Sequence, residues 1–311
     1  MFDRDFPGTG KSVGILGVPL GFAAGTFGSE MGPQSIRQQN LRAQIEELGY
    51  AVQDYGDLDI RRSDRVPDAN ENPRYLREMI AASEVICPAV GNIFRENQIP
   101  VILGGDHSIA MATLSGVSSH FHNQNEEIGL IWFDAHADIN TPETSPSGNL
   151  HGMPLAVLFG RGAPKLTNLC GFSPKFNPKF CAHIGARDLD VGEKRLIREL
   201  GLRCFTMNEL DRRGMFACVQ DAIEIASGAN GGFAVTFDVD VLDPIDAPGS
   251  GTLVRGGIFY REAHVALETI AETGKMRSLE VVEVNPTLDT NNRTSELAVE
   301  LILSALGKTI L

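Results

Sequence analysis

The chain has 311 residues and a formal net charge of −13, with 40 acidic residues against 27 basic ones. Nucleic-acid-binding proteins usually carry a basic face, and no block of Lys and Arg occurs here, so we expect no nucleic-acid partner. Hydrophobic residues make up 42% of the chain and charged residues 22%, which is typical of a soluble globular protein.

Short apolar runs alternate along the chain with longer amphipathic stretches. The predicted strands are Val13–Leu16, Ala51–Asp54, Pro100–Leu103, Ile128–Asp134, Phe180–Ile184, Arg203–Phe205, Phe233–Asp238 and Met276–Val284. The predicted helices are Gln34–Leu48, Arg74–Glu96, Glu193–Leu200, Met215–Ala226, Tyr260–Thr273 and Thr294–Leu306. This alternation predicts an α/β fold with a parallel sheet flanked by helices. No linker or internal repeat interrupts it, so we expect one domain over residues 1–311.

Three stretches are too polar, or too rich in Pro, Ser, Thr and Gly, for regular structure: Leu58–Asn72, Asn140–Gly148 and Pro164–Pro178. We expect them to be loops. In open α/β sheets, ligands bind in the crevice at the carboxyl ends of the strands. The residues that follow each predicted strand are therefore the first candidates for function.

Cysteine usage and hydropathy indicate the cellular location of the protein. Five cysteines without a CxxC pair argue against a disulfide framework and against a zinc knuckle. The segment Met1–Gly10 is polar and predicts no signal peptide. No apolar stretch reaches the roughly 18 residues needed to span a bilayer. We expect a cytoplasmic protein without a membrane partner.

Three of the predicted strands lead into clusters of acidic residues and histidines. These clusters are Asp106-His107-Ser108, Asp134-Ala135-His136-Ala137-Asp138, and Asp238-Val239-Asp240 followed by Asp243. Side chains of an extended segment alternate between two faces, so Asp134, His136 and Asp138 should point the same way, as should Asp238 and Asp240.

Buried carboxylates on one face repel one another unless they are paired or bind a cation. Carboxylate and imidazole ligands without thiolate suit manganese, although other first-row metals fit as well. The pattern predicts a binuclear metal site. Asp106 and Asp243 fall outside the alternation, and we expect them to cap a helix or hold a turn.

The motifs GGDHS (Gly104–Ser108), DAHAD (Asp134–Asp138) and FDVDVLDP (Phe237–Pro244) resemble the three signature motifs of the ureohydrolases. This family includes arginase, agmatinase and guanidinobutyrase, and the resemblance extends from GVPLGFAAG (Gly17–Gly25) to EVNP (Glu283–Pro286). It implies a three-layer α/β/α fold with an eight-stranded parallel sheet, and two Mn²⁺ ions per chain. The resemblance assigns one ion to His107, Asp134, Asp138 and Asp238, and the other to His136, Asp134, Asp238 and Asp240.

The resemblance also implies the catalytic residues. A hydroxide that bridges two metals would attack the guanidinium carbon. Glu283 occupies the family's guanidinium-binding position, and His151 in SGNLHG (Ser147–Gly152) resembles the histidine that shuttles protons. We place Asp138 with these two among the catalytic residues. Glu280 is expected to be a surface charge, and the remaining histidines (His120, His122, His183 and His264) are expected to be structural.

Two segments resemble those with which arginases bind the far end of L-arginine. The loop between Asp138 and His151 puts Asn140, Ser145, Ser147 and Asn149 where the α-carboxylate is bound. The segment ARDLDVGE puts Asp188, Asp190 and Glu193 where the α-ammonium is bound. The resemblance thus favours hydrolysis of L-arginine to L-ornithine and urea, by a homotrimer or homohexamer of the shorter bacterial type.

The sequence departs from the arginase pattern at three positions. Ser145 stands where arginases often have Thr, and Gly249 and Ser250 stand where they more often have Ala and Thr. Gly249 and Ser250 lie near the expected metals, so these two changes put the catalytic rate or the metal preference in doubt.

Three alternatives stay open. An agmatinase or guanidinobutyrase would use the same metals but would need a different pocket in place of Asn140–Asn149. A single-zinc deacetylase of related fold would not need both His107 and the second carboxylate pair. A metal-holding or amino-acid-sensing scaffold without turnover would be expected to have lost ligands or His151.

Overall fold

The computed structural model describes residues 7–60, 66–68 and 71–310. The predicted polar start Met1–Gly10, the predicted loop Leu58–Asn72 and the last residue of the predicted domain lie partly or wholly outside these ranges.

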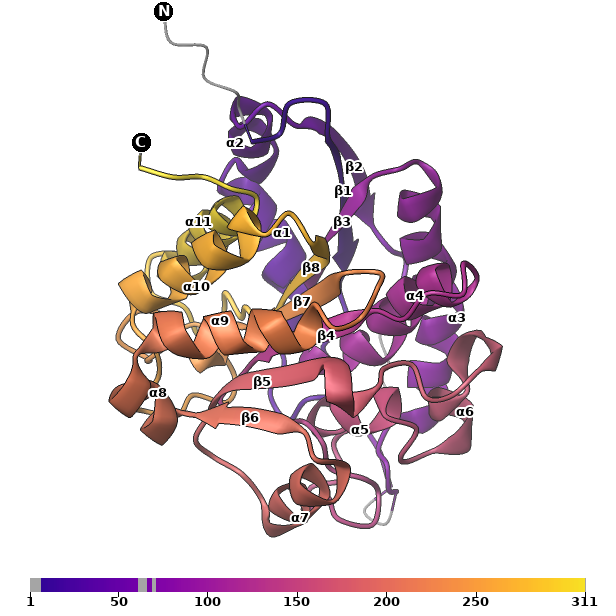
Figure 1. Cartoon of the computed structure of the whole chain (residues 1–311). Coiled ribbons are helices and arrows are strands. Elements are labelled where there is room, and N and C mark those ends of the chain that lie inside the picture. Colours follow the sequence, from indigo (N-terminus) through magenta and orange to yellow (C-terminus); the bar gives the residue numbers. More distant parts are fainter. Residues whose placement is uncertain (1–6, 61–65, 69–70, 311) are drawn as a thin grey trace, which may run out of the picture.

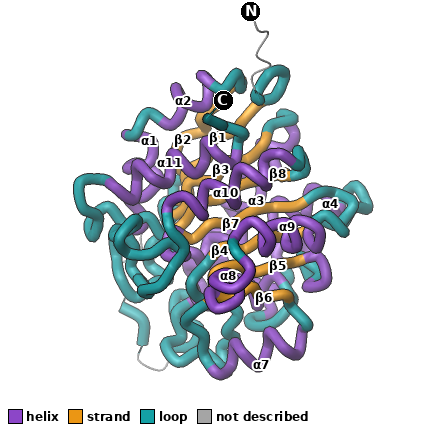
Figure 2. Tube along the Cα trace, turned by 60° about the vertical axis from the view of Figure 1, so that its left-hand side comes forward, coloured by secondary structure: helices purple, strands orange, loops and turns teal. Residues whose placement is uncertain are grey.

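Eight parallel strands form one sheet that runs through the middle of the molecule (Figures 1 and 2). Their bounds are β1 Ser12–Val18, β2 Ala51–Asp57, β3 Ile99–Gly104, β4 Gly129–Phe133, β5 Cys181–Ala186, β6 Arg203–Thr206, β7 Phe233–Asp238 and β8 Met276–Val282. The order across the sheet is β2-β1-β3-β8-β7-β4-β5-β6. All eight predicted strands are present, and the predicted parallel sheet is confirmed.

Helices cover both faces of this sheet (Figure 1). They are α1 Gly32–Gln38, α2 Leu41–Glu47, α3 Leu76–Arg95, α4 Ala110–His122, α5 Pro154–Leu158, α6 Pro164–Thr167, α7 Val191–Leu200, α8 Met207–Arg213, α9 Met215–Ala226, α10 Tyr260–Glu272 and α11 Arg293–Ala305. Residues of α1, α2, α9, α10 and α11 share one core, whereas residues of α3, α4 and α5 share the other. The three-layer α/β/α fold is therefore confirmed. No helix in the described ranges is long and apolar enough to cross a bilayer.

Three of the helix and loop predictions are corrected. The stretch Gln34–Leu48 is two helices, because Asn40 adopts the left-handed conformation (φ 59°) between α1 and α2. Helix α4 was not predicted, since nearly all its side chains are buried and it shows no polar face. The predicted loop Pro164–Pro178 contains the single helical turn α6.

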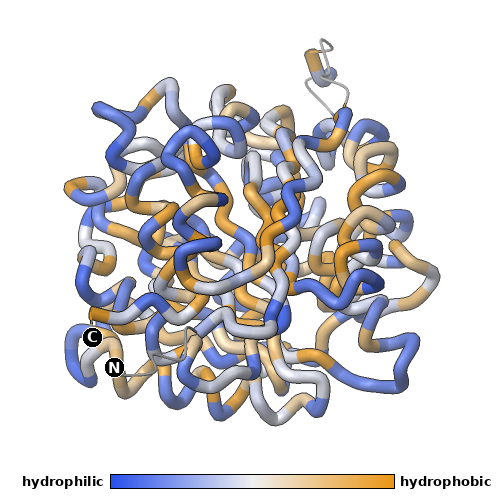
Figure 3. Tube along the Cα trace, turned by 90° about the horizontal axis from the view of Figure 1, so that it is seen from above, coloured by the Kyte–Doolittle hydropathy of each residue, from blue (hydrophilic) through white to orange (hydrophobic). Residues whose placement is uncertain are grey.

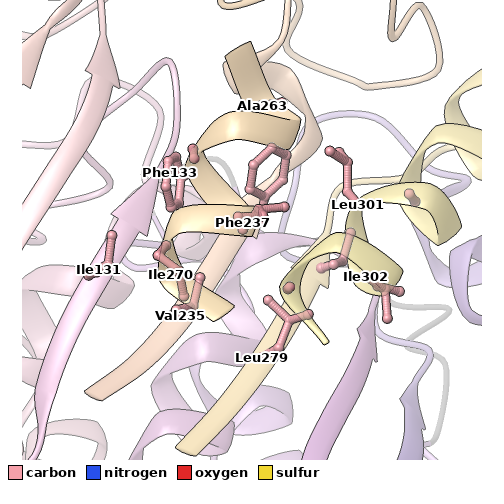
Figure 4. Close-up of a cluster of buried hydrophobic side chains, with 14 of the residues drawn as sticks. Ile131, Phe133, Val235, Phe237, Ala263, Ile270, Leu279, Leu301 and Ile302 are labelled. Carbon is pink, nitrogen blue, oxygen red and sulfur yellow. The ribbon is translucent and has the colours of Figure 1, made fainter. Parts of the chain in front are cut away.

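The central strands are buried on both faces, and their alternation divides the apolar side chains between the two cores. In β4, Ile131 and Phe133 belong to the core under α10 and α11, whereas Leu130 and Trp132 belong to the core under α3 and α4. Figure 4 shows the first of these cores, and Figure 3 shows hydrophobic segments running through the interior. Because no water reaches the middle of these strands, polar side chains gather at their ends.

Candidate active site

The predicted site residues follow four neighbouring strands at the carboxyl edge of the sheet. His107 begins a 3₁₀ turn after β3, Asp134 follows β4, Asp238 is the last residue of β7, and Glu283 follows β8. In the sheet these strands lie in the order β3, β8, β7, β4. Residues 176 positions apart, such as His107 and Glu283, are thereby brought into contact.

The first group of potential ligands surrounds His107, which is fully buried. Its Nδ1 lies 3.1 Å from Asp134 Oδ2, 3.1 Å from Asp138 Oδ2 and 3.2 Å from Asp238 Oδ2. These are the four residues that the family resemblance assigned to one ion.

The second group surrounds His136, which is half-buried. Its Nδ1 lies 3.1 Å from Asp240 Oδ2 and 3.5 Å from Asp134 Oδ1. Asp134 therefore faces one histidine with each of its oxygens. Asp238 was expected to serve both ions, and its Oδ1 accepts the backbone N–H of Asp240 at 2.8 Å.

The same-face argument behind this prediction is wrong, although the residues do converge. The chain is not extended from Asp134 to Asp138, because β4 ends at Phe133 and Asp138 adopts the left-handed region (φ 50°). Asp240 likewise lies in the 3₁₀ turn Val239–Val241, and Asp238 caps this turn. Tight turns, rather than strand pleating, aim the side chains inward.

Both groups fit divalent cations. Two ligand atoms about 2.1 Å from one ion and at right angles to each other lie about 3 Å apart, which matches the spacing around His107. His107 Nδ1 is buried and makes no hydrogen bond, whereas its Nε2 lies 3.0 Å from Thr236 Oγ1. A buried nitrogen lone pair surrounded by three carboxylate oxygens is suited to binding a metal.

The pKa values of the cluster also favour the binding of divalent cations. Burial and the charges of Asp240 and Asp134 raise the pKa of Asp238 well above its usual value. Burial and the charge of Asp134 also raise the pKa of Asp138, to about 6. Burial opposes charge on His107 as well, but its carboxylate neighbours raise the pKa of this imidazole well above normal. Without a cation the cluster therefore has to hold extra protons, which a divalent ion would displace.

Two residues that support the potential ligands were not predicted in this role. Trp132 stacks on the His107 ring at 4.3 Å and donates its indole N–H to Asp134 Oδ2 at 3.0 Å. His183 Nε2 lies 2.6 Å from the carbonyl oxygen of His136. Burial lowers the pKa of His183 to about 4, so its imidazole is neutral at physiological pH and its N–H can donate to that oxygen. The available sequence signal was a large side chain with a polar N–H group within an apolar strand, as at Trp132 and His183.

Glu280 corrects another expectation, because it is 2% exposed and not a surface charge. By contrast, Asp106 and Asp243 behave as predicted. Asp106 caps the turn at His107 by accepting the backbone N–H of Ser108 at 3.0 Å. Asp243 holds its turn by accepting backbone N–H groups of Ile245 and Gly256.

Glu283 and His151 form a pair beside the ligands. His151 Nδ1 lies 3.3 Å from Glu283 Oε1, which also accepts the backbone N–H of His107 at 2.9 Å. Although burial lowers it, the hydrogen bond and charge of Glu283 raise the pKa of His151 to about 9. Glu283 adopts the left-handed region (φ 63°), a conformation that costs a non-glycine residue free energy and is often found at active sites.

A cavity of about 170 Å³ opens onto the two ligand groups. Its lining contains, from the predicted site residues, His136, Asp138, Asn140, Ser145, Ser147, His151, Asp188, Asp190, Glu193 and Asp238. Most of the predicted substrate-binding side chains thus share one space with the potential metal ligands. Glu283 and Asn149 lie outside the lining. Glu283 contacts His151, which does line the cavity, and Asn149 Oδ1 accepts from Arg74 at 3.3 Å.

Hydrogen bonds fix one wall of this cavity. Asn140 donates its side-chain amide to Asp190 Oδ2 at 2.9 Å. Glu193 accepts the backbone N–H of Asp190 at 2.8 Å, in the first turn of α7. Burial raises the pKa of Glu193 to about 7. Glu193 therefore helps to begin its helix as well as facing the cavity.

The departure at Gly249 has a local cause. A Cβ added at this position would lie 2.6 Å from the Cβ of Asp289, too close without movement of the backbone. Nearby, Thr252 donates its hydroxyl to Asp240 Oδ2 at 2.9 Å. The loop is therefore packed directly against a potential metal ligand.

The chain matches the model of the Arginase family over residues 11–307. It is 44% identical to an arginase of Bacillus subtilis over 301 residues, covering 97% of this chain and 99% of that protein. Its fold is similar to the crystal structure of an arginase from Bacillus caldovelox (TM-score 0.90, 42% identity, 97% and 100% of the two chains). It is also similar to an Entamoeba histolytica arginase in complex with L-ornithine (TM-score 0.87, 28% identity, 96% and 99%).

Proposed function

The chain belongs to the arginase family, and from this premise we propose that it hydrolyses the guanidinium group of L-arginine to L-ornithine and urea. We further propose two Mn²⁺ ions per chain. One would be held by His107, Asp134, Asp138 and Asp238, and the other by His136, Asp134, Asp238 and Asp240.

The cavity carries this proposal. It joins ligand residues such as Asp138 and Asp238 to the polar wall formed by Asn140, Ser147 and Asp190. A substrate with a guanidinium at one end and an amino-acid group at the other would contact the ligand residues and the polar wall at the same time. The carboxylates of Asp188, Asp190 and Glu193 suit an ammonium, and the amide and hydroxyls of Asn140, Ser145 and Ser147 suit a carboxylate.

When bound, the metal pair supplies Lewis-acid activation of a water molecule for attack on the guanidinium carbon. Glu283 holds the planar cation in register, because a carboxylate matches the guanidinium fork with two hydrogen bonds. Glu283 Oε1 lies 3.3 Å from His151 Nδ1, so a guanidinium that pairs with this oxygen competes with the imidazole.

That competition gives His151 its role. Once the substrate compensates the charge of Glu283, His151 loses the contact that raises its pKa to about 9. Its proton becomes more acidic, in a side chain that lines the cavity. His151 can then donate this proton to the departing amine, as a general acid with a pKa near the working pH.

The decisive experiment is urea release by manganese-loaded protein offered L-arginine, agmatine or guanidinobutyrate separately. Agmatine has no carboxylate, so polar groups around Asn140 and Ser147 would be left to water. We expect arginine to exceed agmatine by about 10²–10⁴ in kcat/KM, because the cavity is open and water replaces part of the lost contact. Comparable values would exclude an arginase and leave a ureohydrolase of other specificity.

A charge change at Asp190 tests the ammonium contact. Asp190→Asn keeps a side chain that suits the start of α7 and removes the negative charge. We expect KM for arginine to rise while kcat changes less, because the contact forms before the chemistry and persists through it. Guanidinobutyrate, which lacks the ammonium, is the internal control. An equal loss for both substrates would contradict the assignment of Asp190.

We also propose the remaining properties that the family resemblance implies: a single domain over residues 1–311, a homotrimer or homohexamer, and a cytoplasmic location. Light scattering of the purified protein measures the assembly directly.

A further inference from the structure

Glu280 is a buried acid inside the sheet, and the proposed reaction leaves it without a role. It is 2% exposed in the middle of β8, and its register partners are Ile102 on β3 and Thr236 on β7. Thr113 of α4 donates its hydroxyl to Glu280 Oε2 at 2.5 Å, whereas Glu280 Oε1 is buried with no hydrogen-bond partner. A buried carboxylate oxygen without a donor costs free energy, so its presence needs a reason.

Thr236 connects this carboxylate to the first ligand group. Its Oγ1 lies 3.0 Å from His107 Nε2, and Thr236 is the register partner of Glu280 on the neighbouring strand. Thr236 is fully buried and lies two residues before Asp238 on the same face of β7. Glu280, Thr236 and His107 therefore form a line that ends at the metal-facing Nδ1.

The number of protons available sets the direction of the hydrogen bonds along this line. An imidazole that binds a metal through Nδ1 must carry its proton on Nε2. Thr236 Oγ1 then accepts that N–H, and its own single proton is free to point at Glu280. An ionised carboxylate accepts without donating, so the Glu280 carboxylate on the neighbouring strand can complete the sequence His107 Nε2–H to Thr236 O–H to Glu280. With the other tautomer, Thr236 would have to donate its single proton to His107, and that proton could not point at Glu280.

We propose that Glu280, acting through Thr236, is a positioning residue that fixes the tautomer and orientation of His107 for metal binding. The inference rests on the proposed function only for the identity of the metal. Carboxylates often orient metal-binding histidines in this way, and loss of such a partner typically costs 10–100-fold in metal affinity or activity. Here a threonine hydroxyl lies between the two groups.

The test is calorimetric titration of Mn²⁺ into metal-stripped protein. Thr236→Val removes the hydroxyl at constant size, and Glu280→Met removes both carboxylate oxygens at similar length. Each should weaken one of the two ions by about 10–100-fold. Thr236→Ser and Glu280→Gln keep a hydroxyl and an acceptor, and should restore affinity close to wild type. Ser278→Ala, a buried change on the same face of β8, is the matched control and should bind both ions normally.

The double variant separates a relay from two unrelated packing defects. Residues in one hydrogen-bonded line are non-additive, so Thr236→Val combined with Glu280→Met should lose no more affinity than the worse single variant. Losses that add in the double variant would overturn the proposal, as would wild-type affinity in both single variants. Should Glu280→Met fail to fold by circular dichroism, Thr236→Val against Thr236→Ser decides the question.

This outcome is independent of the proposed reaction. Metal affinity is measured without substrate, so a wild-type protein that binds two Mn²⁺ ions but releases no urea would refute the function and leave the relay standing. Normal urea release by the wild-type protein, together with unchanged metal affinity in Thr236→Val, would refute the relay and leave the proposed function standing.

Discussion

The contact between His151 and Glu283 predicts how the stability of the metal-free protein depends on pH. The folded protein holds the His151 proton up to about pH 9, whereas an unfolded histidine loses it near 6.5. Between these values the folded state binds more protons, so its stability falls as pH rises. The stabilisation is complete below pH 6.5 and is lost by pH 9.

The magnitude follows from the pKa difference. At about 1.4 kcal/mol for each pKa unit, the shift corresponds to about 3 kcal/mol of unfolding free energy. The side chain of His151 is 18% exposed, and water screens part of the interaction, so this is an upper limit. Burial lowers the pKa of His151, and Glu283, followed by Asp138 and Asp106, raises it.

Glu283→Gln is the perturbation. The amide oxygen can still accept the backbone N–H of His107, but the negative charge beside His151 is gone. Urea denaturation in the presence of a chelator, at half-unit steps from pH 6 to 9.5, should show a shallower decline for Glu283→Gln than for wild type. Glu296→Gln, an exposed change on α11, should follow wild type. Parallel profiles for wild type and Glu283→Gln would refute the reasoning.

Three further predictions concern the metals, the proton donor and the core. Asp134 faces both histidines, so Asp134→Ala should lower the bound manganese from two equivalents by more than one; a loss confined to one ion would contradict a shared ligand. His151→Asn should reduce kcat by about 10²–10⁴ with metal content unchanged, and loss of metal in this variant would show that its role is misassigned. Phe237 is fully buried with its ring 5.3 Å from that of Phe133 (Figure 4), so Phe237→Ala should cost about 3–5 kcal/mol in denaturant unfolding; a cost under about 1 kcal/mol would mean that the site repacks.

The sequence predicts the sheet well because its signal is local. Each central strand is a short apolar run bounded by turn residues, and all eight runs are strands in the structure. The helices are less predictable where burial is complete or the backbone is unusual. Helix α4 has almost no polar face, and the left-handed Asn40 divides a periodic stretch into two helices.

The clusters of potential ligands could be located from sequence, but the geometry that joins them could not. The clusters after β3, β4 and β7 mark the carboxyl edge, yet the turns at Asp138 and Asp240 depend on contacts across the sheet. Glu280 was misjudged for the same reason. A glutamate near the end of the chain's last strand looks exposed until the sheet order places β8 between β3 and β7.

The position of β8 also explains why we place the proposed binuclear centre here and not elsewhere along the edge. The four central strands are covered on both faces, so the carboxylates at their ends are removed from water. The four aspartates proposed as ligands bring four negative charges, and burial raises the pKa of Asp238 and Asp138. Two divalent cations would balance those charges without requiring bound protons. The line from His107 through Thr236 leads to a fifth buried carboxylate, that of Glu280, inside the sheet. The proposed relay therefore predicts that metal affinity depends partly on residues that neither the metal nor the substrate touches.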